Sequence, residues 1–344
     1  MRTLRVLVSV ALAVGVLVAL LAWSGISPRA VGAAALRVEP RVLASAFGAL
    51  VLLYGARALR IRLLLPAALR PPWPRLSAAT AAWILDAQVL PAKVGEATLV
   101  WHLRRLGVPS AEGFVALVVS RLLDLAVLLG AFGCAALALG LAGGDPAAAS
   151  FGARLPWLVP LGACLLPVAL VLGALVARGA AAWRCVPRLL ARLGFGGAGV
   201  MGRVLAFSER VGEALAAVDG RRRAWAVLAS VAVWALILGF YALLAVGLGV
   251  ESSAGPPLGL FGLVFGASLA VLGGLVPASG FLGFGMLDVG WVAGFAVLGV
   301  PRELAVESGL AFHVLYLVGV GVLGVVGHLM LAGRAPAAPP KGAR

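Results

Sequence analysis

Long apolar segments, separated by short charged or proline-rich stretches, make up most of this chain. Several of them exceed the roughly 18–20 residues that an α-helix needs to cross a bilayer. We predict full spans near residues 4–23, 42–65, 112–141, 155–177, 224–248 and 306–331. The weak alternating segments of about ten residues that are typical of a membrane β-barrel do not occur. The pattern therefore predicts an all-α, polytopic membrane protein with about six full spans.

Two further apolar stretches are broken near their middle. Residues 78–103 are interrupted by Pro, Lys, Gly and Glu at 91–96, and residues 258–298 by Pro, Ser, Gly and Asp at 277–288. We predict that each stretch folds as a re-entrant hairpin of two half-helices, with its irregular turn covered by protein or by a wet cavity. Residues 258–276 are also long enough to cross the membrane alone, which would make the second hairpin a full span.

Composition agrees with a membrane protein. Hydrophobic residues make up 62% of the chain and charged residues only 12%, compared with about 25% charged residues in a typical soluble domain. Net charge is +15, a balance that can indicate nucleic-acid binding. The basic residues lie between the apolar segments, however, where membrane topology explains them better, so we expect no nucleic-acid partner.

Basic residues also predict the orientation. They gather near the N-terminus, around residues 57–75, at 104–105, across 178–223 and at the C-terminus. The positive-inside rule places these regions, and both termini, in the cytoplasm. The two hairpins then enter from opposite sides, as an inverted repeat whose breaks meet near the membrane midplane. Arg57, Arg60 and Arg62 end a span, and we expect them to snorkel to the interface.

We treat residues 1–333 as a single integral membrane domain. Within it, residues 178–223 are predicted to form a basic cytoplasmic loop whose amphipathic helix lies against the headgroups. Residues 334–344 are rich in Pro and Ala and are expected to be a disordered cytoplasmic tail. The first apolar segment is longer than the 7–15-residue core of a cleaved signal peptide, so we expect it to be retained.

Charged residues inside the apolar segments are the candidates for function. A charge near the bilayer centre costs roughly 2.5–3.5 kcal/mol on insertion scales and normally faces the bundle interior. Arg121 and Asp124 share one helical face. They either neutralise each other and lock helix packing, or Arg121 binds an anionic headgroup that Asp124 orients. Lys93 and Glu96 present the same two alternatives at the first break, where Lys93 and free backbone N–H groups could cradle a phosphate.

The second break offers glycines that could bind a phosphate through backbone N–H groups. Asp288 has no cation near it in the sequence, so it must find Lys93 or Arg121 in space, carry a proton, or face water. Asp86 is expected to be an ion-pair partner of Lys93 or Arg121, with a proton relay as the alternative. We predict this set of substrate-binding residues: Lys93, Gly95, Glu96, Arg121, Asp124, Gly280, Gly283 and Asp288.

Histidine and cysteine residues show no metal-ligand spacing. His102, His313 and His328 lie far from one another along the chain and from Cys134, Cys164 and Cys185. No Ser-His-Asp or phosphate-loop spacing appears either. We therefore expect no metal, no cofactor and no catalytic residue.

Three motifs together resemble the lysylphosphatidylglycerol synthase transmembrane (flippase-like) family. They are Leu90-Pro91-x-x-x-Gly95-Glu96, Arg121-x-x-Asp124, and Pro277-x-Ser279-Gly280-x-x-Gly283 followed by Asp288. The resemblance is to the stand-alone membrane form, without the soluble aminoacyl-transfer domain. It differs at two positions: Ser120 stands where the family usually has an acid, and Asp288 where it usually has Glu.

The resemblance implies an integral protein of the inner (plasma) membrane associated with lipid translocation or envelope modification. We expect it to translocate an anionic or phosphate-bearing lipid, with the lipid phosphate headgroup as its partner. Two alternatives stay open. One is a membrane enzyme acting on lipid-linked substrates, for which the sequence offers no donor-binding motif. The other is a non-catalytic scaffold for envelope-biosynthesis enzymes.

Overall fold

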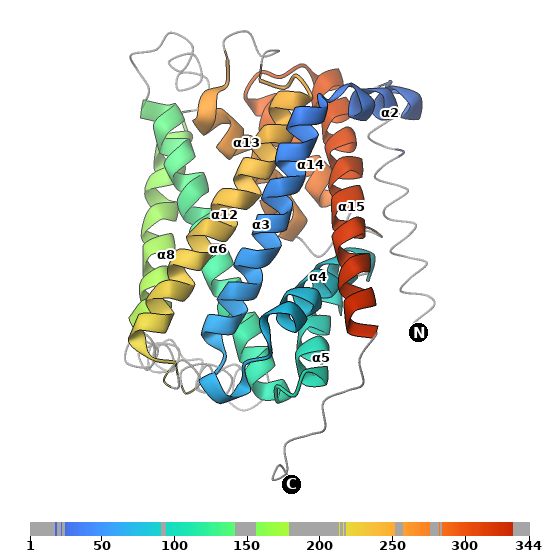
Figure 1. Ribbon diagram of the computed structural model, residues 1–344. Coiled ribbons are helices and arrows are strands. Elements are labelled where there is room, and N and C mark those ends of the chain that lie inside the picture. Colours follow the sequence, from blue (N-terminus) through green and yellow to red (C-terminus); the bar gives the residue numbers. More distant parts are fainter. Residues whose placement is uncertain are drawn as a thin grey trace, which may run out of the picture.

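The computed structural model describes residues 25–90, 94–141, 156–178, 218–251, 257–275 and 284–332, and the single residues 18, 22, 213, 216 and 282. Every regular element in these ranges is helical (Figure 1). The α-helices are α2 (Pro28–Arg37), α3 (Pro40–Leu64), α4 (Trp73–Val89), α5 (Thr98–Arg105), α6 (Ser110–Leu141), α8 (Leu158–Arg178), α12 (Gly220–Gly247), α13 (Gly259–Leu275), α14 (Met286–Val297) and α15 (Arg302–Ala332). Two 3-10 turns, η1 (Ala67–Leu69) and η2 (Val94–Ala97), lie between helices.

Five of these helices are long and apolar enough to cross a membrane: α3, α6, α8, α12 and α15. They coincide with five of the six full spans that the apolar pattern predicts. The sixth, residues 4–23, lies almost wholly outside the described residues, as do the loop 178–223 and the tail 334–344. The structure therefore confirms an all-α, polytopic membrane architecture.

Local sequence sets several helix boundaries. Pro40 occupies the first turn of α3, where its missing N–H costs nothing. The Asp219 carboxylate caps α12 by accepting a hydrogen bond from the Arg222 backbone N–H at 2.9 Å. Ser27 caps α2 in the same way through Ala30. Helix α2 lies across the upper end of the bundle in Figure 1 and contacts α15.

Both broken segments form helical hairpins. Helix α4 reverses through η2 into α5, and α13 reverses into α14. Figure 1 shows α4 and α5 in the lower half of the bundle and α13 and α14 in the upper half. Each reversal falls at a predicted Pro-Gly break. Within the two breaks, residues 91–93, 277–281 and 283 lie outside the described residues.

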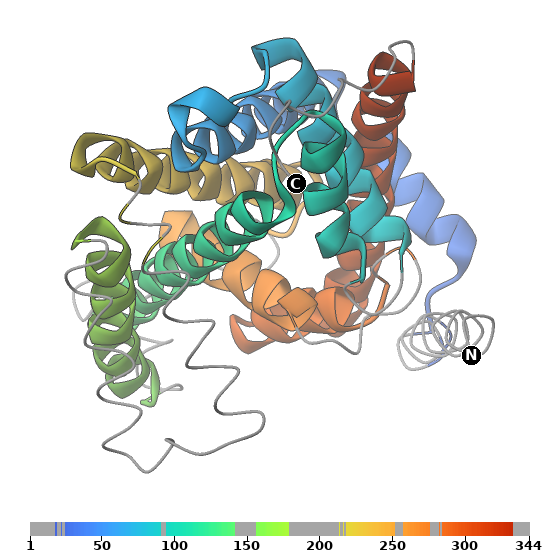
Figure 2. The same ribbon diagram turned by 90° about the horizontal axis from the view of Figure 1, so that it is seen from below.

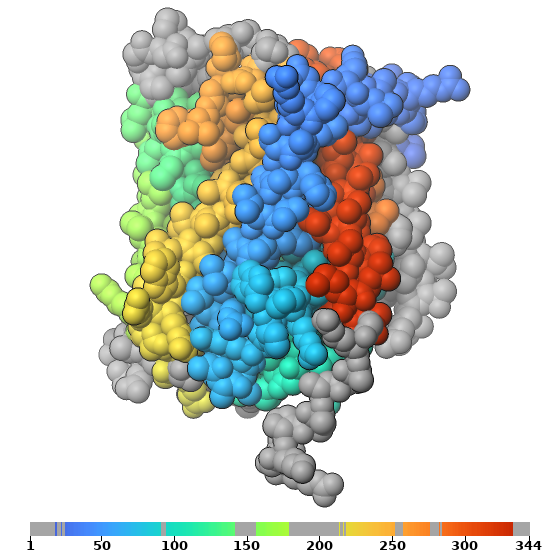
Figure 3. Space-filling model, in the orientation of Figure 1, coloured from blue at the N-terminus to red at the C-terminus, as the bar shows by residue number. Residues whose placement is uncertain are grey.

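The two halves of the chain are interlocked. Helix α3 of the first half packs against α12 of the second, α4 packs against α15, and α13 packs against α6. Figure 3 shows α3 on one face, lying between α12 and α15 with α4 below. Seen from below, α8 lies at the outer edge beside α6, on the side away from α15 (Figure 2). Each hairpin is thus held by a long helix from the other half.

Aromatic packing fixes the second hairpin to the bundle. The Trp291 ring of α14 stacks on the Phe312 ring of α15, with 4.5 Å between ring centroids. Tyr241 of α12 lies 4.4 Å from the same Phe312 ring. The Trp291 indole N–H donates to Ser308 Oγ at 3.1 Å, which satisfies its polar atom inside the core. This cluster joins α12, α14 and α15 behind the cavity described next.

Candidate functional site

A cavity of about 330 Å³ lies where both hairpins meet the long helices. Seven helices contribute to its wall, which is mostly apolar. The lining residues are Leu50, Leu53, Tyr54 and Arg57 of α3, Ile84 and Gln88 of α4, Arg121, Asp124, Leu125 and Leu128 of α6, Trp234, Ile237, Phe240 and Tyr241 of α12, Val271, Gly274 and Leu275 of α13, Leu287 of α14 and Tyr316 of α15. A few polar groups therefore converge in a largely apolar space, as is typical of ligand sites.

Asp124 is the centre of the polar cluster. Its carboxylate accepts two hydrogen bonds from the Arg60 guanidinium, at 2.6 and 3.2 Å, and one from the Trp234 indole N–H at 3.0 Å. Arg121, one turn earlier on α6, donates to it at 3.0 Å. Because Arg60 is only 1% exposed, this bidentate pair supplies the counter-charge that a buried guanidinium requires.

Arg121 links α6 to the first hairpin. One of its guanidinium nitrogens binds Asp124, and the other binds Glu96 of η2 in a second ion pair. Its charged group also lies over the Trp83 ring of α4, 5.2 Å from the centroid. The position of the hairpin is thereby coupled to a residue that lines the cavity.

Arg57 differs from the other two arginines of the cluster. Within the part of the chain that the structure describes, no carboxylate lies within 4.0 Å of its guanidinium. Its buried Nε has no hydrogen-bond partner, a feature that it shares with Arg60. The buried Tyr54 hydroxyl, one turn away on α3, also lacks a partner. Buried polar groups are nearly always paired in native proteins. Among the described residues that line the cavity, two are arginines and one is a carboxylate, so the wall carries an excess of positive charge.

Sequence analysis predicts part of this cluster. It identifies Glu96, Arg121 and Asp124, which the structure brings together. The expected snorkelling of Arg57 and Arg60 to the interface was wrong, because both side chains turn inward to the cavity and to Asp124. The available signal was their i,i+3 spacing on one face of an apolar helix. That spacing does not distinguish the inward face from the outward one.

Gly95 has a packing role in the structure. A Cβ at this position would clash with the Asp86 carbonyl oxygen and the Ala87 backbone of α4. Gly95 therefore lets η2 lie directly on α4, and it does not line the cavity. The remaining predicted binding residues at the two breaks, Lys93, Gly280 and Gly283, lie outside the described residues.

Asp288 is buried behind the cavity and not in its wall. One carboxylate oxygen accepts from the Gly285 backbone N–H at 2.9 Å, which caps α14, and the other lies 2.7 Å from His313 Nδ1. His313 Nε2 lies 3.1 Å from the Leu282 carbonyl oxygen, which can only accept. Nε2 is therefore the donor in that hydrogen bond. The partner of Asp288 is this histidine, whereas sequence analysis offered Lys93 or Arg121 as its partner, with a bound proton or contact with water as the alternatives.

Asp86 lies away from the cavity and contacts two histidines. His102 Nε2 is 2.9 Å from one carboxylate oxygen, and His328 Nε2 is 3.0 Å from the other. The predicted pairing with Arg121 was wrong, because Glu96 and Asp124 occupy that guanidinium. The prediction that the histidines are isolated was wrong for this pair. Sixteen and 242 residues separate them from Asp86, so no local pattern could have revealed the cluster.

Comparison with known proteins identifies one family. The family model described as the lysylphosphatidylglycerol synthase TM region matches residues 6–324, nearly the whole chain. No curated protein matches.

Proposed function

The chain belongs to the lysylphosphatidylglycerol synthase TM region family, and from that premise we propose that it moves phosphate-bearing lipids between the two leaflets of the inner membrane. A multi-pass membrane protein with a lipid-related role follows from the family and from the five apolar helices. Beyond that, we propose that the protein translocates lipid, that the cavity is its binding site, and that both termini face the cytoplasm.

The unpaired guanidinium of Arg57 carries the proposal. A charge near the bilayer centre costs roughly 2.5–3.5 kcal/mol on insertion scales. Among the described residues no carboxylate lies within 4.0 Å of Arg57, and Asp124 attracts its guanidinium only from a greater distance. A phosphate oxygen would offset that cost, because guanidinium and phosphate match as a planar, charge-assisted pair. Arg121 lines the same cavity and would supply a second cation.

The size and lining of the cavity suit a headgroup. At about 330 Å³ it lies at the lower end of the roughly 300–1,000 Å³ range of small-molecule sites. A phosphate with a small polar group fits that volume, whereas two acyl chains would have to remain in the bilayer. The apolar remainder of the wall keeps the site dry, which strengthens each phosphate contact.

Arg121 also offers a way to couple binding to movement. Its ion pair with Glu96 is partly exposed, with side-chain exposures of 35% and 28%, whereas the Asp124 carboxylate is only 9% exposed. A phosphate arriving at Arg121 would compete with Glu96 more readily than with Asp124. Release of Glu96 would free η2, and with it the first hairpin, while Asp124 and Arg60 keep α3 and α6 together.

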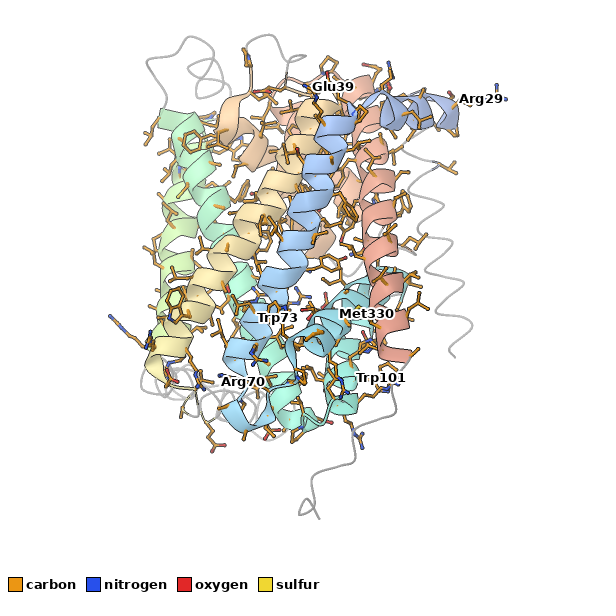
Figure 4. The ribbon with its side chains drawn as sticks, in the orientation of Figure 1. Arg29, Glu39, Arg70, Trp73, Trp101 and Met330 are labelled. Atoms are coloured by element: carbon orange, nitrogen blue, oxygen red, sulfur yellow. The ribbon has the colours of Figure 1, made fainter. Side chains whose placement is uncertain are left out.

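The interlocked halves support the inverted-repeat part of the proposal. Each hairpin packs against the long helix that follows the other hairpin, α4 against α15 and α13 against α6, and the helices that precede the hairpins, α3 and α12, pack against each other. Such an arrangement, with a cavity at the junction, is typical of transporters that open alternately to each side. Helix α5, whose last turn contains Arg104 and Arg105, lies at the lower end in Figure 1, where Figure 4 labels Arg70. By the positive-inside rule we assign that end, and both termini, to the cytoplasm.

Reconstitution in liposomes tests the proposal. Purified protein should accelerate leaflet exchange of fluorescent phospholipids, compared with protein-free vesicles of the same composition. Anionic, zwitterionic and polyprenyl-linked phosphate lipids should be compared, because the proposed arginine contacts would recognise the phosphate and not the rest of the lipid. A folded protein that moves none of these lipids contradicts the proposal.

Arg57→Gln is the sharpest variant for this assay. It removes the proposed phosphate contact but breaks no described ion pair, so we expect the fold to persist. Charge-assisted hydrogen bonds contribute about 1.5–3 kcal/mol, which corresponds to a fall in transport rate of roughly tenfold or more. Arg62→Gln is the matched control: it removes the same charge from the same helix outside the cavity, where Arg62 binds the Pro71 carbonyl oxygen. Equal rates for the two variants would refute the role of Arg57.

A further inference from the structure

We propose that Asp86, His102 and His328 form a binding site for a divalent transition-metal ion, such as Zn²⁺, which fastens the first hairpin to the last helix. The site lies outside the cavity. The proposal goes beyond lipid movement and does not depend on it. Three separate elements contribute one side chain each: α4, α5 and α15.

The geometry brings the ligand atoms together without a metal. The Asp86 carboxylate lies 2.9 Å from His102 Nε2 and 3.0 Å from His328 Nε2, and all three ligand atoms lie within 4.8 Å of one another. Tetrahedral Zn²⁺ with bonds of about 2.0–2.1 Å needs ligand atoms roughly 3.3 Å apart. A modest rotation of His328, whose side chain is 42% exposed, would close the remaining distance.

His102 is the buried ligand of the site. Its ring is 1% exposed, and its buried Nδ1 has no hydrogen-bond partner. The neutral ring is the form that binds metal ions, and with a metal on Nε2 the ring proton lies on Nδ1. That N–H has no acceptor among the described residues, a cost that the coordinate bond must exceed.

Charge completes the argument. Asp86 has no arginine or lysine partner among the described residues, where its only ion-pair partners are the two imidazoles. Two neutral imidazoles and one carboxylate are a ligand set that zinc and related first-row ions prefer, and a fourth position stays open. A divalent cation would compensate the carboxylate and replace two neutral hydrogen bonds with coordinate bonds.

The surroundings of the site would hold the His102 ring in place and leave the His328 side chain free to rotate. Trp101 packs edge-on against His102, with 4.8 Å between ring centroids, and Arg105 lies over the Trp101 ring. Figure 4 shows Trp101 beside Met330 at the lower end of α15, where His328 also lies. His102 Nδ1 has no acceptor to orient the ring when Nε2 binds a metal. Because such partners typically contribute 10–100-fold in affinity, we expect exchangeable binding of the metal.

Metal titration of the full-length protein tests the site. The protein should carry an affinity tag without histidine, be stripped with a chelator in detergent, and be titrated with Zn²⁺ against a chromogenic chelator. Co²⁺ should also be added, since its visible absorption reports tetrahedral coordination. We expect one Zn²⁺ per chain and a Co²⁺ spectrum with nitrogen and oxygen ligands.

His328→Gln is the main variant, because this exposed side chain can change without loss of the fold. It should weaken Zn²⁺ binding by about tenfold or more, and Asp86→Asn should do the same. The matched control replaces Cys134, Cys164 and Cys185 by Ser and should bind as the wild type does. Absence of stoichiometric binding by the wild type, or unchanged binding by His328→Gln, would overturn the proposal. Neither result depends on whether the protein moves lipid.

Discussion

At the scale of single residues, the role of each buried charged side chain depends on its ion-pair partner. Arg60 has a bidentate carboxylate and a structural role, whereas Arg57, one turn away, has none and faces the cavity. Two arginines of the same helix thus have different surroundings, and for that reason we assign them different roles. Their separation by three residues predicts a shared face, but only the packed bundle shows which carboxylate reaches which guanidinium.

Asp124→Ala tests whether the ion pair between Arg60 and Asp124 stabilises the fold. It leaves Arg60 buried without a counter-charge, so we expect a loss of about 3–5 kcal/mol in stability. The thermal melting temperature in detergent should fall clearly. The double variant Arg60→Leu/Asp124→Leu removes both charges and should recover most of the loss, because an apolar pair is often as stable as a buried ion pair. A melting temperature for Asp124→Ala equal to the wild type would contradict the role assigned to Asp124.

Residue-level prediction from sequence succeeds where partners are local. The pairing of Arg121 with Asp124 follows from i,i+3 spacing within one helix. The pairs Asp288 with His313, Asp86 with His328 and Arg60 with Asp124 join residues that only the tertiary fold brings together. Histidine was the residue type most misjudged, since a neutral imidazole shows no charge pattern along the chain.

At the scale of elements, the apolar pattern determines most of the helices. The five long helices begin and end within a few residues of the predicted spans, because a bilayer requires a fixed length of apolar helix. The hairpins also follow from the pattern, since Pro and Gly interrupt the apolar runs where the chain reverses. The tight packing inside the hairpins does not follow from it: Gly95 was expected to bind substrate, and in the structure it lies against the backbone of α4.

Gly95→Ala and Gly290→Ala test this packing, one in each hairpin. A Cβ at Gly95 would collide with the Asp86 carbonyl oxygen, and one at Gly290 with the Leu269 carbonyl oxygen. Since backbone cannot yield as a side chain can, each change should cost about 1–3 kcal/mol. Gly55→Ala in α3 and Gly239→Ala in α12 are the controls, because an added Cβ meets nothing within 4 Å there.

Those controls should be neutral or slightly stabilising, by about 0.5–1 kcal/mol, since alanine favours helix. Melting temperatures in detergent compare the four variants directly. If the hairpin variants have the same melting temperatures as the controls, the helices of the hairpins pack less tightly than the structure indicates.

At the scale of the whole molecule, two interlocked halves enclose a cavity with more positive than negative charge. Arg57 and Arg121 line it against a single carboxylate, Asp124. The order of the broken and unbroken apolar segments predicts the two halves, whereas the exchange of hairpins between them, α4 onto α15 and α13 onto α6, emerges only in the fold. Packing between distant helices depends on shape, which a hydropathy pattern does not contain.

The central claim is that the positive charge of Arg57 receives a lipid phosphate, and a charge series at this one position tests it most directly. Leaflet exchange of an anionic phospholipid should be measured for Arg57→Lys and Arg57→Gln in matched liposomes. The account predicts that Lys, which keeps the charge but loses the planar fork, moves lipid more slowly than the wild type but clearly faster than Gln. Wild-type rates in Arg57→Gln would contradict it.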